Sequence, residues 1–285
     1  MSRIAYVNGR YLPLRDAAVN IEDRGYQFSD GVYEVCEVRG GRLVDERRHI
    51  ERLMRSLREL RIAMPMSPAA LGVVFRETVR RNRVRWGIVY LQITRGVARR
   101  DHAFPPPGTL PGIVVTARNL DFAHAERLAA DGVAVVTVAD NRWDRVDIKS
   151  VSLLPNVLAK QAAREQGARE AWFVDRDGFV TEGSSSNAWI VTRDGKLVTR
   201  PADHAILKGI TRTVVLEVLK AHGIRLEERG FTVEEALEAR EAFITSASQI
   251  VIPVVQIDGR PVGNGAPGLL STALRRDFHR HAEFA

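Results

Sequence analysis

Residues 180–191 read VTEGSSSNAWIV, so a carboxylate, a glycine, three serines and an asparagine separate two apolar runs. Glycine, serine and asparagine are turn formers because they permit unusual backbone angles or hydrogen-bond locally. A two-residue turn would be enough to join two strands. The extra polar residues therefore have two interpretations. One is a solvated loop, and the other is that Glu182 faces a bound group that requires a negative charge.

The composition is that of an ordinary folded protein. Of the 285 residues, 45% are hydrophobic and 27% are charged, and this length allows one large domain or two of ordinary size. No apolar run approaches the ~18 residues of a membrane helix, and the first residues lack the apolar core of a signal peptide. The single cysteine, Cys36, excludes an internal disulfide and fits a reducing compartment. We expect a cytoplasmic protein without membrane association.

The net charge of +7 does not predict nucleic-acid binding. The basic residues are spread along the chain and mixed with 35 acidic ones, whereas a nucleic-acid surface requires a focused basic patch. Neither an RNA-binding aromatic motif nor zinc-finger spacing is visible, and no metal site is expected.

The first part of the chain predicts strands at 4–14 and 31–44, with turns at Asn8-Gly9 and Gly40-Gly41. A helix is predicted around 50–60, where apolar residues recur with helical spacing, and another at 68–82. Two further strands, 87–96 and 111–118, enclose the long proline-rich loop 97–112, and loops of this length are commonly functional.

The second part mixes strands and helices. Strands are predicted near 133–139, 171–174, 196–199 and 242–245, and helices at 156–166 and 211–222. Thr232 and Glu235 form a capping box. We expect two α/β-type domains, residues 1–118 and 131–285, joined by a linker at 119–130. Small-molecule sites tend to form in a cleft between such domains.

The chain has only five lysines, so a catalytic lysine can be sought by elimination. Lys149 lies where a predicted strand meets a predicted helix, close in sequence to Arg142 and Arg145. A lysine in such a place, partly desolvated and near other cations, can act as a nucleophile or base. Lys208 precedes a predicted helix, and the remaining three are expected at the surface: Lys160, Lys196 and Lys220.

Two segments have features of a phosphate site. In LKGIT (207–211), Gly209 permits close backbone approach, and Thr211 is predicted to cap a helix whose free N–H groups and dipole favour phosphate. Residues 243–250, FITSASQI, form a second hydroxyl-rich strand exit. Each segment alone fits an ordinary cap or turn. Together with a lysine and a carboxylate they fit pyridoxal 5'-phosphate. The lysine would form a Schiff base, Glu182 would pair with the pyridine nitrogen, and Ser184, Ser185 and Ser186 would form a polar wall.

Several segments of the chain resemble those of a known family. The segments EDRGYQFSDGVYEV, HIERL, RRDHAFP, DIKS, LLPNVLAKQ, VTEGSSSN, LKGITR and ITSASQI resemble, in order and spacing, the D-amino-acid aminotransferases. These are fold-type IV pyridoxal-phosphate enzymes, and the resemblance runs from about Tyr6 to Phe278. It implies a mixed α/β and α+β fold, with a smaller N-terminal α/β domain and a larger, barrel-like C-terminal coenzyme domain. It also implies a homodimer that moves the amino group between a D-amino acid and a 2-oxo acid, with D-alanine and 2-oxoglutarate as the expected pair.

The resemblance assigns roles to residues of this chain. Lys149 would bind the coenzyme and carry the proton, and Glu182 would hold the ring nitrogen. The phosphate would be held by Arg52, the backbone of Ile210, Thr211, and the Ser246-Ala247 turn. Tyr33, Arg100 and His102 would bind the substrate, since arginine offers a planar fork to a carboxylate and the other two add donors.

Two patterns concern the surroundings of Arg52. By helical spacing, Arg52 lies nearly opposite the apolar stripe of its helix, which predicts a solvated side chain. Strand alternation places Glu34 on one face with Val32 and Cys36, where a buried carboxylate needs a partner. We hypothesise an arginine, and Arg52 is the candidate.

Other functions remain open from the sequence. A branched-chain L-amino-acid aminotransferase or aminodeoxychorismate lyase would share the coenzyme residues, and so would an amine transaminase. The branched-chain enzyme does not need the Arg-x-His pair of residues 100–102. A basic binding protein without catalysis belongs to another class, and it would lack the visible absorption of a bound coenzyme.

Overall fold

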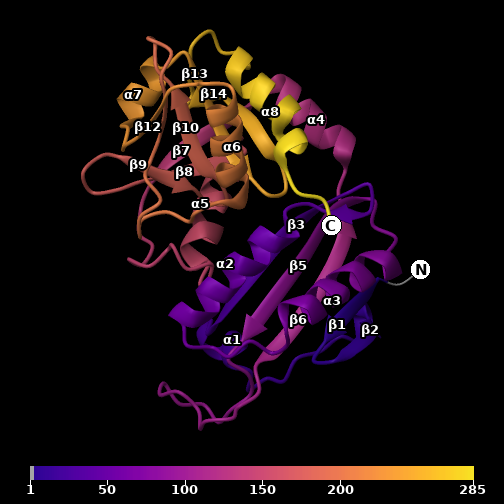
Figure 1. Cartoon of the computed structure of the whole chain (residues 1–285). Coiled ribbons are helices and arrows are strands. Elements are labelled where there is room, and N and C mark those ends of the chain that lie inside the picture. Colours follow the sequence, from indigo (N-terminus) through magenta and orange to yellow (C-terminus); the bar gives the residue numbers. More distant parts are fainter. Residues whose placement is uncertain (1–2) are drawn as a thin grey trace. The chain divides into compact units, whose positions relative to one another are not determined.

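The computed structural model describes residues 3–285. They form two compact units, each with its own sheet (Figure 1). Unit 1 contains the described residues up to Phe122 together with Ile148–Ser152 and Glu283–Ala285. Unit 2 contains Ala123–Asp147 and Leu153–Ala282.

The sheet of unit 1 is antiparallel throughout, in the order β2-β1-β6-β5-β3-β4. The predicted turn at Asn8-Gly9 joins β1 to β2, and the positive φ angles of 45° and 93° at these two residues suit a tight hairpin. The strands are β1 (Ile4–Val7), β2 (Arg10–Pro13), β3 (Gly31–Arg39), β4 (Arg42–Leu43), β5 (Trp86–Thr94) and β6 (Gly112–Asn119).

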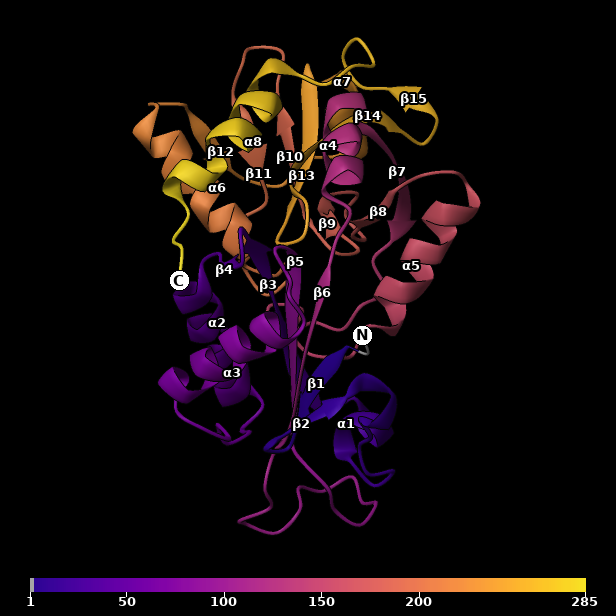
Figure 2. The same ribbon diagram turned by 90° about the vertical axis from the view of Figure 1, so that its right-hand side faces the viewer.

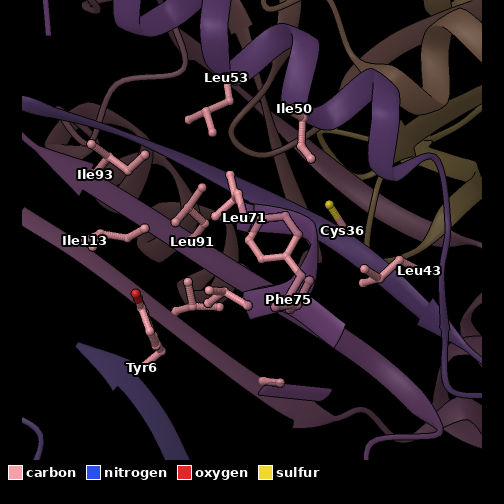
Figure 3. Packing of buried hydrophobic residues seen from close by; sticks show 14 of the residues in the cluster. Tyr6, Cys36, Leu43, Ile50, Leu53, Leu71, Phe75, Leu91, Ile93 and Ile113 are labelled. Carbon is pink, nitrogen blue, oxygen red and sulfur yellow. The ribbon is translucent and has the colours of Figure 1, made fainter. Parts of the chain in front are cut away.

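Two helices pack against this sheet. Helix α2 (Glu46–Glu59) contacts β3, and α3 (Pro68–Arg81) contacts β1, β5 and β6. Pro68 suits the first turn of α3, and Ser67 caps it by accepting the Ala70 N–H. The core between the helices and the sheet is shown in Figure 3 and includes Leu53, Leu71, Phe75 and Cys36. Two shorter elements are η1 (Leu14–Asp16) and α1 (Arg24–Phe28).

Two short segments from the C-terminal half of the sequence belong to unit 1. Ser150 pairs with Val32 of β3, and Phe284 pairs with Val44 after β4. Both segments fall within the predicted domain 131–285. They belong to unit 1 instead, because their backbones hydrogen-bond to its strands. The predicted linker 119–130 also differs, since most of it forms α4 (Phe122–Asp131).

The sheet of unit 2 follows the order β12-β11-β10-β13-β14-β7-β8-β9, with β15 beside β14. Strand β9 lies at one end of this order, yet only residues 184–186 separate it from β10. The sheet therefore curls, which confirms the expected mixed, barrel-like fold. Its strands are β7 (Val133–Ala139), β8 (Glu170–Val174), β9 (Val180–Gly183), β10 (Asn187–Val191), β11 (Leu197–Thr199), β12 (Leu226–Glu228), β13 (Glu241–Ser246), β14 (Ile250–Ile257) and β15 (Arg260–Pro261).

Helices cover this curled sheet. Helices α6 and α8 pack beside each other and against β13 (Figure 2). Thr232 caps α7 by accepting the Glu235 N–H, as the capping box predicts. In addition to α4, the helices of unit 2 are α5 (Leu154–Glu165), α6 (Ile210–Ala221), α7 (Val233–Glu238) and α8 (Leu269–His281). Among the described residues, no helix has the length and apolar character needed to cross a membrane.

Candidate functional site

Lys149 is held on the edge of unit 1 next to Tyr33. The Tyr33 N–H donates to the Lys149 carbonyl at 3.0 Å, and the Lys149 N–H donates to Ser56 Oγ of α2 at 3.3 Å. The Lys149 Nζ atom lies 4.2 Å from the centre of the Tyr33 ring. The structure thus brings together two residues predicted for the site, and the ammonium faces an aromatic surface that attracts it.

Tyr33 lies on the face of β3 opposite α2, because side chains alternate along a strand. Its ring stacks on Tyr90 of β5 at 5.9 Å between centres. The Tyr90 hydroxyl donates to Gln92 Oε1 at 2.8 Å, and burial, together with Tyr33, raises the pKa of Tyr90 to about 12. Tyr90 therefore stays protonated near neutral pH, as a donor beside Tyr33.

Glu34, on the other face of β3, is buried with Arg52. Arg52 donates from Nε and Nη2 to the two carboxylate oxygens, each at 2.8 Å. His49 Nδ1 makes a third contact with Glu34 at 2.7 Å. Burial would raise the pKa of Glu34, but Arg52 and His49 more than offset this, so the pKa lies well below its ordinary value. Burial lowers the pKa of His49.

The hypothesis that Arg52 pairs with Glu34 is confirmed, and the prediction that Arg52 is solvated is wrong. The side chain of Arg52 is only 9% exposed. The buried face of α2 is wider than its apolar stripe. His49, Arg52 and Ser56 on this helix also pack against other residues of unit 1. A fork-shaped ion pair with the carboxylate of Glu34 makes this burial tolerable.

Arg100 and His102 lie together in the loop between β5 and β6. The Arg100 guanidinium carbon is 5.1 Å from the centre of the Phe28 ring, and the His102 ring centre is 5.3 Å from it. Both side chains are exposed. Buried Arg24 fastens the loop by donating to the carbonyl oxygens of Asp101 and His102. The long loop is thus anchored at the Arg-x-His pair, while the two side chains face outward.

In unit 2, the Glu182 residue is 6% exposed and its carboxylate accepts hydrogen bonds from three segments of the chain. Arg142 Nη1 donates to Oε1 at 2.6 Å. Asn187 Nδ2 and the Leu207 N–H donate to Oε2 at 3.0 and 3.1 Å. A carboxylate with several such donors is held in its charged form. The solvated-loop interpretation of residues 182–187 therefore does not fit.

The three serines have a different role from the one predicted. All three hydroxyls donate to the buried carboxylate of Glu170 on β8, Ser185 at 2.8 Å and Ser186 at 3.2 Å. Lys160, expected at the surface and 43% exposed, also pairs with Glu170 at 3.1 Å. The serines therefore fix the turn by satisfying a buried charge, because an ionised carboxylate in the interior needs donors.

Asn187 joins Glu182 to the start of α6 and the end of β13. Its Nδ2 also donates to the Leu207 carbonyl at 2.9 Å, and its backbone pairs with Thr245. A Cβ on Gly209 would lie 2.2 Å from Asn187 Oδ1, so only glycine fits there. Through Asn187, the first turn of α6 and the Ser246-Ala247 turn lie in one region of unit 2.

This region has two further features. The residue capping α6 is Gly209, so the prediction that Thr211 is the cap is wrong; Ile210 begins the helix and Thr211 is buried in its first turn. After the Ser246-Ala247 turn, Ile250 has φ of 63°. Such an angle is unusual and strained for a β-branched residue. The free N–H groups of the first helical turn suit an anion.

Arg142 and Arg145, the expected cationic neighbours of Lys149, both pair with carboxylates. Arg142 pairs with Asp140 and Glu182, and Arg145 pairs with Asp147 at 3.0 Å. Both positive charges are therefore balanced by carboxylates of unit 2. Within residues 3–285, no group of His, Cys, Asp and Glu side chains is arranged to hold a metal ion.

Four residues next to the predicted site were not identified from the sequence: His49, Tyr90, Arg142 as the partner of Glu182, and Asn187. For two of them a signal existed. Asn187 directly follows the serine run, and His49 lies three residues before Arg52 on the same helix face. Tyr90 and Arg142 are brought in by strand pairing and by a contact across 40 residues, which no local pattern reports.

Comparison with known proteins identifies a family whose description is amino-transferase class IV; its match covers residues 31–257. The chain is 45% identical over 275 residues to a D-alanine aminotransferase of Bacillus licheniformis, covering 95% of each chain. It is 40% identical over 280 residues to the D-alanine aminotransferase of Staphylococcus aureus strain MSSA476, covering 98% of this chain and 97% of the relative.

Solved structures show the same fold. The branched-chain aminotransferase of the archaeon Thermoproteus uzoniensis, solved with norvaline, superposes with a TM-score of 0.85 at 26% identity, covering 98% of this chain and 94% of that one. A second branched-chain amino acid aminotransferase, solved with pyridoxamine 5'-phosphate, superposes with a TM-score of 0.89 at 25% identity and with the same coverage.

The first prediction concerns the buried pair of unit 1. Glu34→Gln should lower the free energy of unfolding by about 3–5 kcal/mol near neutral pH, because it leaves Arg52 buried without its counter-charge. Since the pKa of Glu34 is lowered by folding, its contribution is complete above its ordinary value of 4.5 and is lost as the pH falls further. Denaturant unfolding from pH 7 to pH 3 measures both effects. Equal stability of the two proteins at pH 7 would contradict the prediction.

Proposed function

The chain belongs to the class IV aminotransferases and is a pyridoxal-phosphate enzyme, and on this premise we propose that it transfers the amino group of D-alanine to 2-oxoglutarate. The similarity to D-alanine aminotransferases over nearly the full chain supports this choice of donor. The observation that carries the proposal is the buried, charged carboxylate of Glu182 held beside the first turn of α6.

The residues of unit 2 fit the coenzyme. When bound, pyridoxal phosphate withdraws electrons from the α-carbon of the substrate through its ring. We propose that Glu182 accepts the hydrogen of the ring nitrogen. The backbone of Ile210, the Thr211 side chain and the Ser246-Ala247 turn would hold the phosphate, where Gly209 leaves room for a close approach. Arg52 of unit 1 is proposed as a further phosphate ligand.

Lys149 is the proposed covalent and proton-transferring residue. Its amine would bind the coenzyme, and once released it would take the proton from the substrate α-carbon and return it to the coenzyme carbon. Tyr33, against which Nζ lies, would orient the amine for that transfer. Both substrates would use the same site in turn, so we expect ping-pong kinetics.

Arg100 and His102 are proposed to bind the substrate carboxylate together with Tyr33. The backbone anchors at Asp101 and His102 fix this part of the loop, and both side chains are exposed. An arginine fork matches a carboxylate in shape and charge, and 2-oxo acids and amino acids both carry one.

We propose further that the protein is a homodimer, with the loop between β5 and β6 contributing across the interface. Leu154, Val157 and Leu158 share one face of α5 at helical spacing and are 69%, 59% and 58% exposed. An exposed apolar stripe of this kind marks a surface that is covered by another protein. A two-fold pair of identical chains is the commonest arrangement.

The second prediction tests the proposed reaction. The purified protein with pyridoxal phosphate should form pyruvate from D-alanine and 2-oxoglutarate, and D-alanine should be used far better than L-alanine or L-leucine. Coupled measurement of each oxo-acid product checks this. Turnover of L-amino acids alone would overturn the donor and leave the coenzyme assignment in place.

The third prediction concerns Lys149. Lys149→Ala should abolish transamination and the attachment of coenzyme trapped by borohydride, because no amine remains at the reacting carbon. Mass spectrometry of the reduced protein locates the attachment. Lys208→Ala, the matched control, should keep both. Attachment that persists in Lys149→Ala and is lost in Lys208→Ala would transfer the role to Lys208.

The fourth prediction concerns Arg100. Arg100→Ala should raise the KM for 2-oxoglutarate by roughly tenfold or more through the loss of a charge-assisted contact, while the Kd of the coenzyme stays unchanged. Arg99→Ala, which removes the same charge one residue earlier, is the control and should leave KM nearly unaltered. Equal losses of substrate and coenzyme affinity would instead indicate a structural arginine.

The fifth prediction concerns assembly. Sedimentation equilibrium should give twice the chain mass of 31.8 kDa, and Leu154→Glu with Leu158→Glu should shift it toward one chain because the added charges would be buried. A wild-type protein that sediments as a single chain would refute the dimer.

A further inference from the structure

The carboxylate of Glu182 is not held by a simple ion pair, because its arginine is shared with a second acid. From the geometry of these three groups we infer that Arg142 is a positioning residue that keeps Glu182 charged and aimed, and that Asp140 sets how strongly Arg142 acts on Glu182. The inference rests on the proposed function, in which Glu182 meets the ring nitrogen of the coenzyme.

Arg142 occupies the middle of the group. Its Nε and Nη2 donate to the two oxygens of Asp140 at 2.9 and 2.7 Å. Its Nη1 donates to Glu182 at 2.6 Å. The guanidinium carbon lies 4.3 Å from the centre of the Phe173 ring. One planar guanidinium thus makes a two-bond fork to Asp140 and a third bond to Glu182, a geometry that arginine favours over lysine.

Asp140 is itself fixed. The Thr181 hydroxyl donates to its Oδ2 at 2.8 Å, and Thr181 directly precedes Glu182 on β9. Burial would raise the pKa of Asp140, but the hydrogen bonds and charge of Arg142 more than offset this and leave it below its ordinary value. Asp140 is therefore charged at neutral pH.

The three groups together carry one net negative charge, which favours a cation beside them. Asp140, Arg142 and Glu182 carry two negative charges and one positive charge, and their side chains are 14%, 4% and 8% exposed. One net negative charge in a buried site favours one added positive charge, such as a protonated ring nitrogen. Without Asp140, Arg142 alone would neutralise Glu182. Without Arg142, two buried carboxylates would face each other, and one would take up a proton.

Other charged groups lie around the same place. Asp140 and Arg142 line a cavity of about 500 Å³ whose other walls include Arg200, Asp175, His204 and Asp203. Arg200 donates to Asp175 at 2.7 Å, so this pair also balances its own charge. Asp175 instead pairs with Arg200 and accepts from nearby backbone N–H groups, so it serves as a matched control for Asp140.

The experiment reads the protonation of the ring nitrogen directly. Apoprotein is reconstituted with pyridoxal phosphate labelled with ¹⁵N in the ring, and the ¹⁵N chemical shift is followed against pH. In Asp140→Asn the nitrogen should lose its proton at a pH lower by about one unit or more than in the wild type, the size of effect that one nearby buried charge produces. Asp175→Asn should titrate like the wild type.

The outcomes separate the two proposals. One outcome is that Glu182→Gln lowers the pH at which the ring nitrogen loses its proton while Asp140→Asn does not. That result overturns the inference about Asp140 and Arg142 and leaves the role of Glu182 in place. If Glu182→Gln also leaves the titration unchanged, the proposed role of Glu182 fails and the inference fails with it. A shift of equal size in Asp175→Asn would mean a general effect of charge and would also overturn the inference. Should Asp140→Asn not fold, Asp140→Ser is the second neutral replacement, with the same downward shift expected.

Discussion

A buried carboxylate that must stay charged is the constraint on which the C-terminal unit depends. Glu182 is satisfied by an arginine, a side-chain amide and a backbone N–H from three different segments. Each donor ties a further element to β9, since Asn187 opens β10 and Leu207 precedes α6. The cost of an unpaired buried charge is several kcal/mol, so these segments have to meet in one arrangement. The carboxylate thereby fixes the start of α6 beside the end of β13.

The N-terminal unit repeats this design with other residues. Glu34 takes a fork from Arg52 and a third contact from His49, and this joins β3 to α2. The same strand and helix hold the backbone of Lys149 through Tyr33 and Ser56. In both units a buried acid therefore has a structural role. Its hydrogen bonds join the elements that carry the residues proposed for the chemistry. An ion pair of this kind contributes little net stability, but removing one of its partners is strongly destabilising.

Much of the fold could be predicted from the sequence, because its elements have strong local signals. The Asn8-Gly9 turn and the apolar spacing of α2 predict their own elements, and alternation along β3 places Glu34 in the core. Arg52 is suggested as its partner because a buried carboxylate needs one. The errors came where a distant charge overrides a local pattern. Arg52 is buried against its helical pattern because Glu34 receives it, and the three serines turn to Glu170 because that acid is buried beside them. Lys149 joins unit 1 through backbone pairing with β3, which no spacing along the chain reveals.

We propose that Lys149 and Glu182 bind opposite ends of one coenzyme ring. A crystal structure of the protein loaded with pyridoxal phosphate measures this most directly. We expect continuous density from Lys149 Nζ to the coenzyme and a Glu182 oxygen within about 3.2 Å of the ring nitrogen. A coenzyme joined to another lysine, or a ring nitrogen out of hydrogen-bonding range of Glu182, would contradict it.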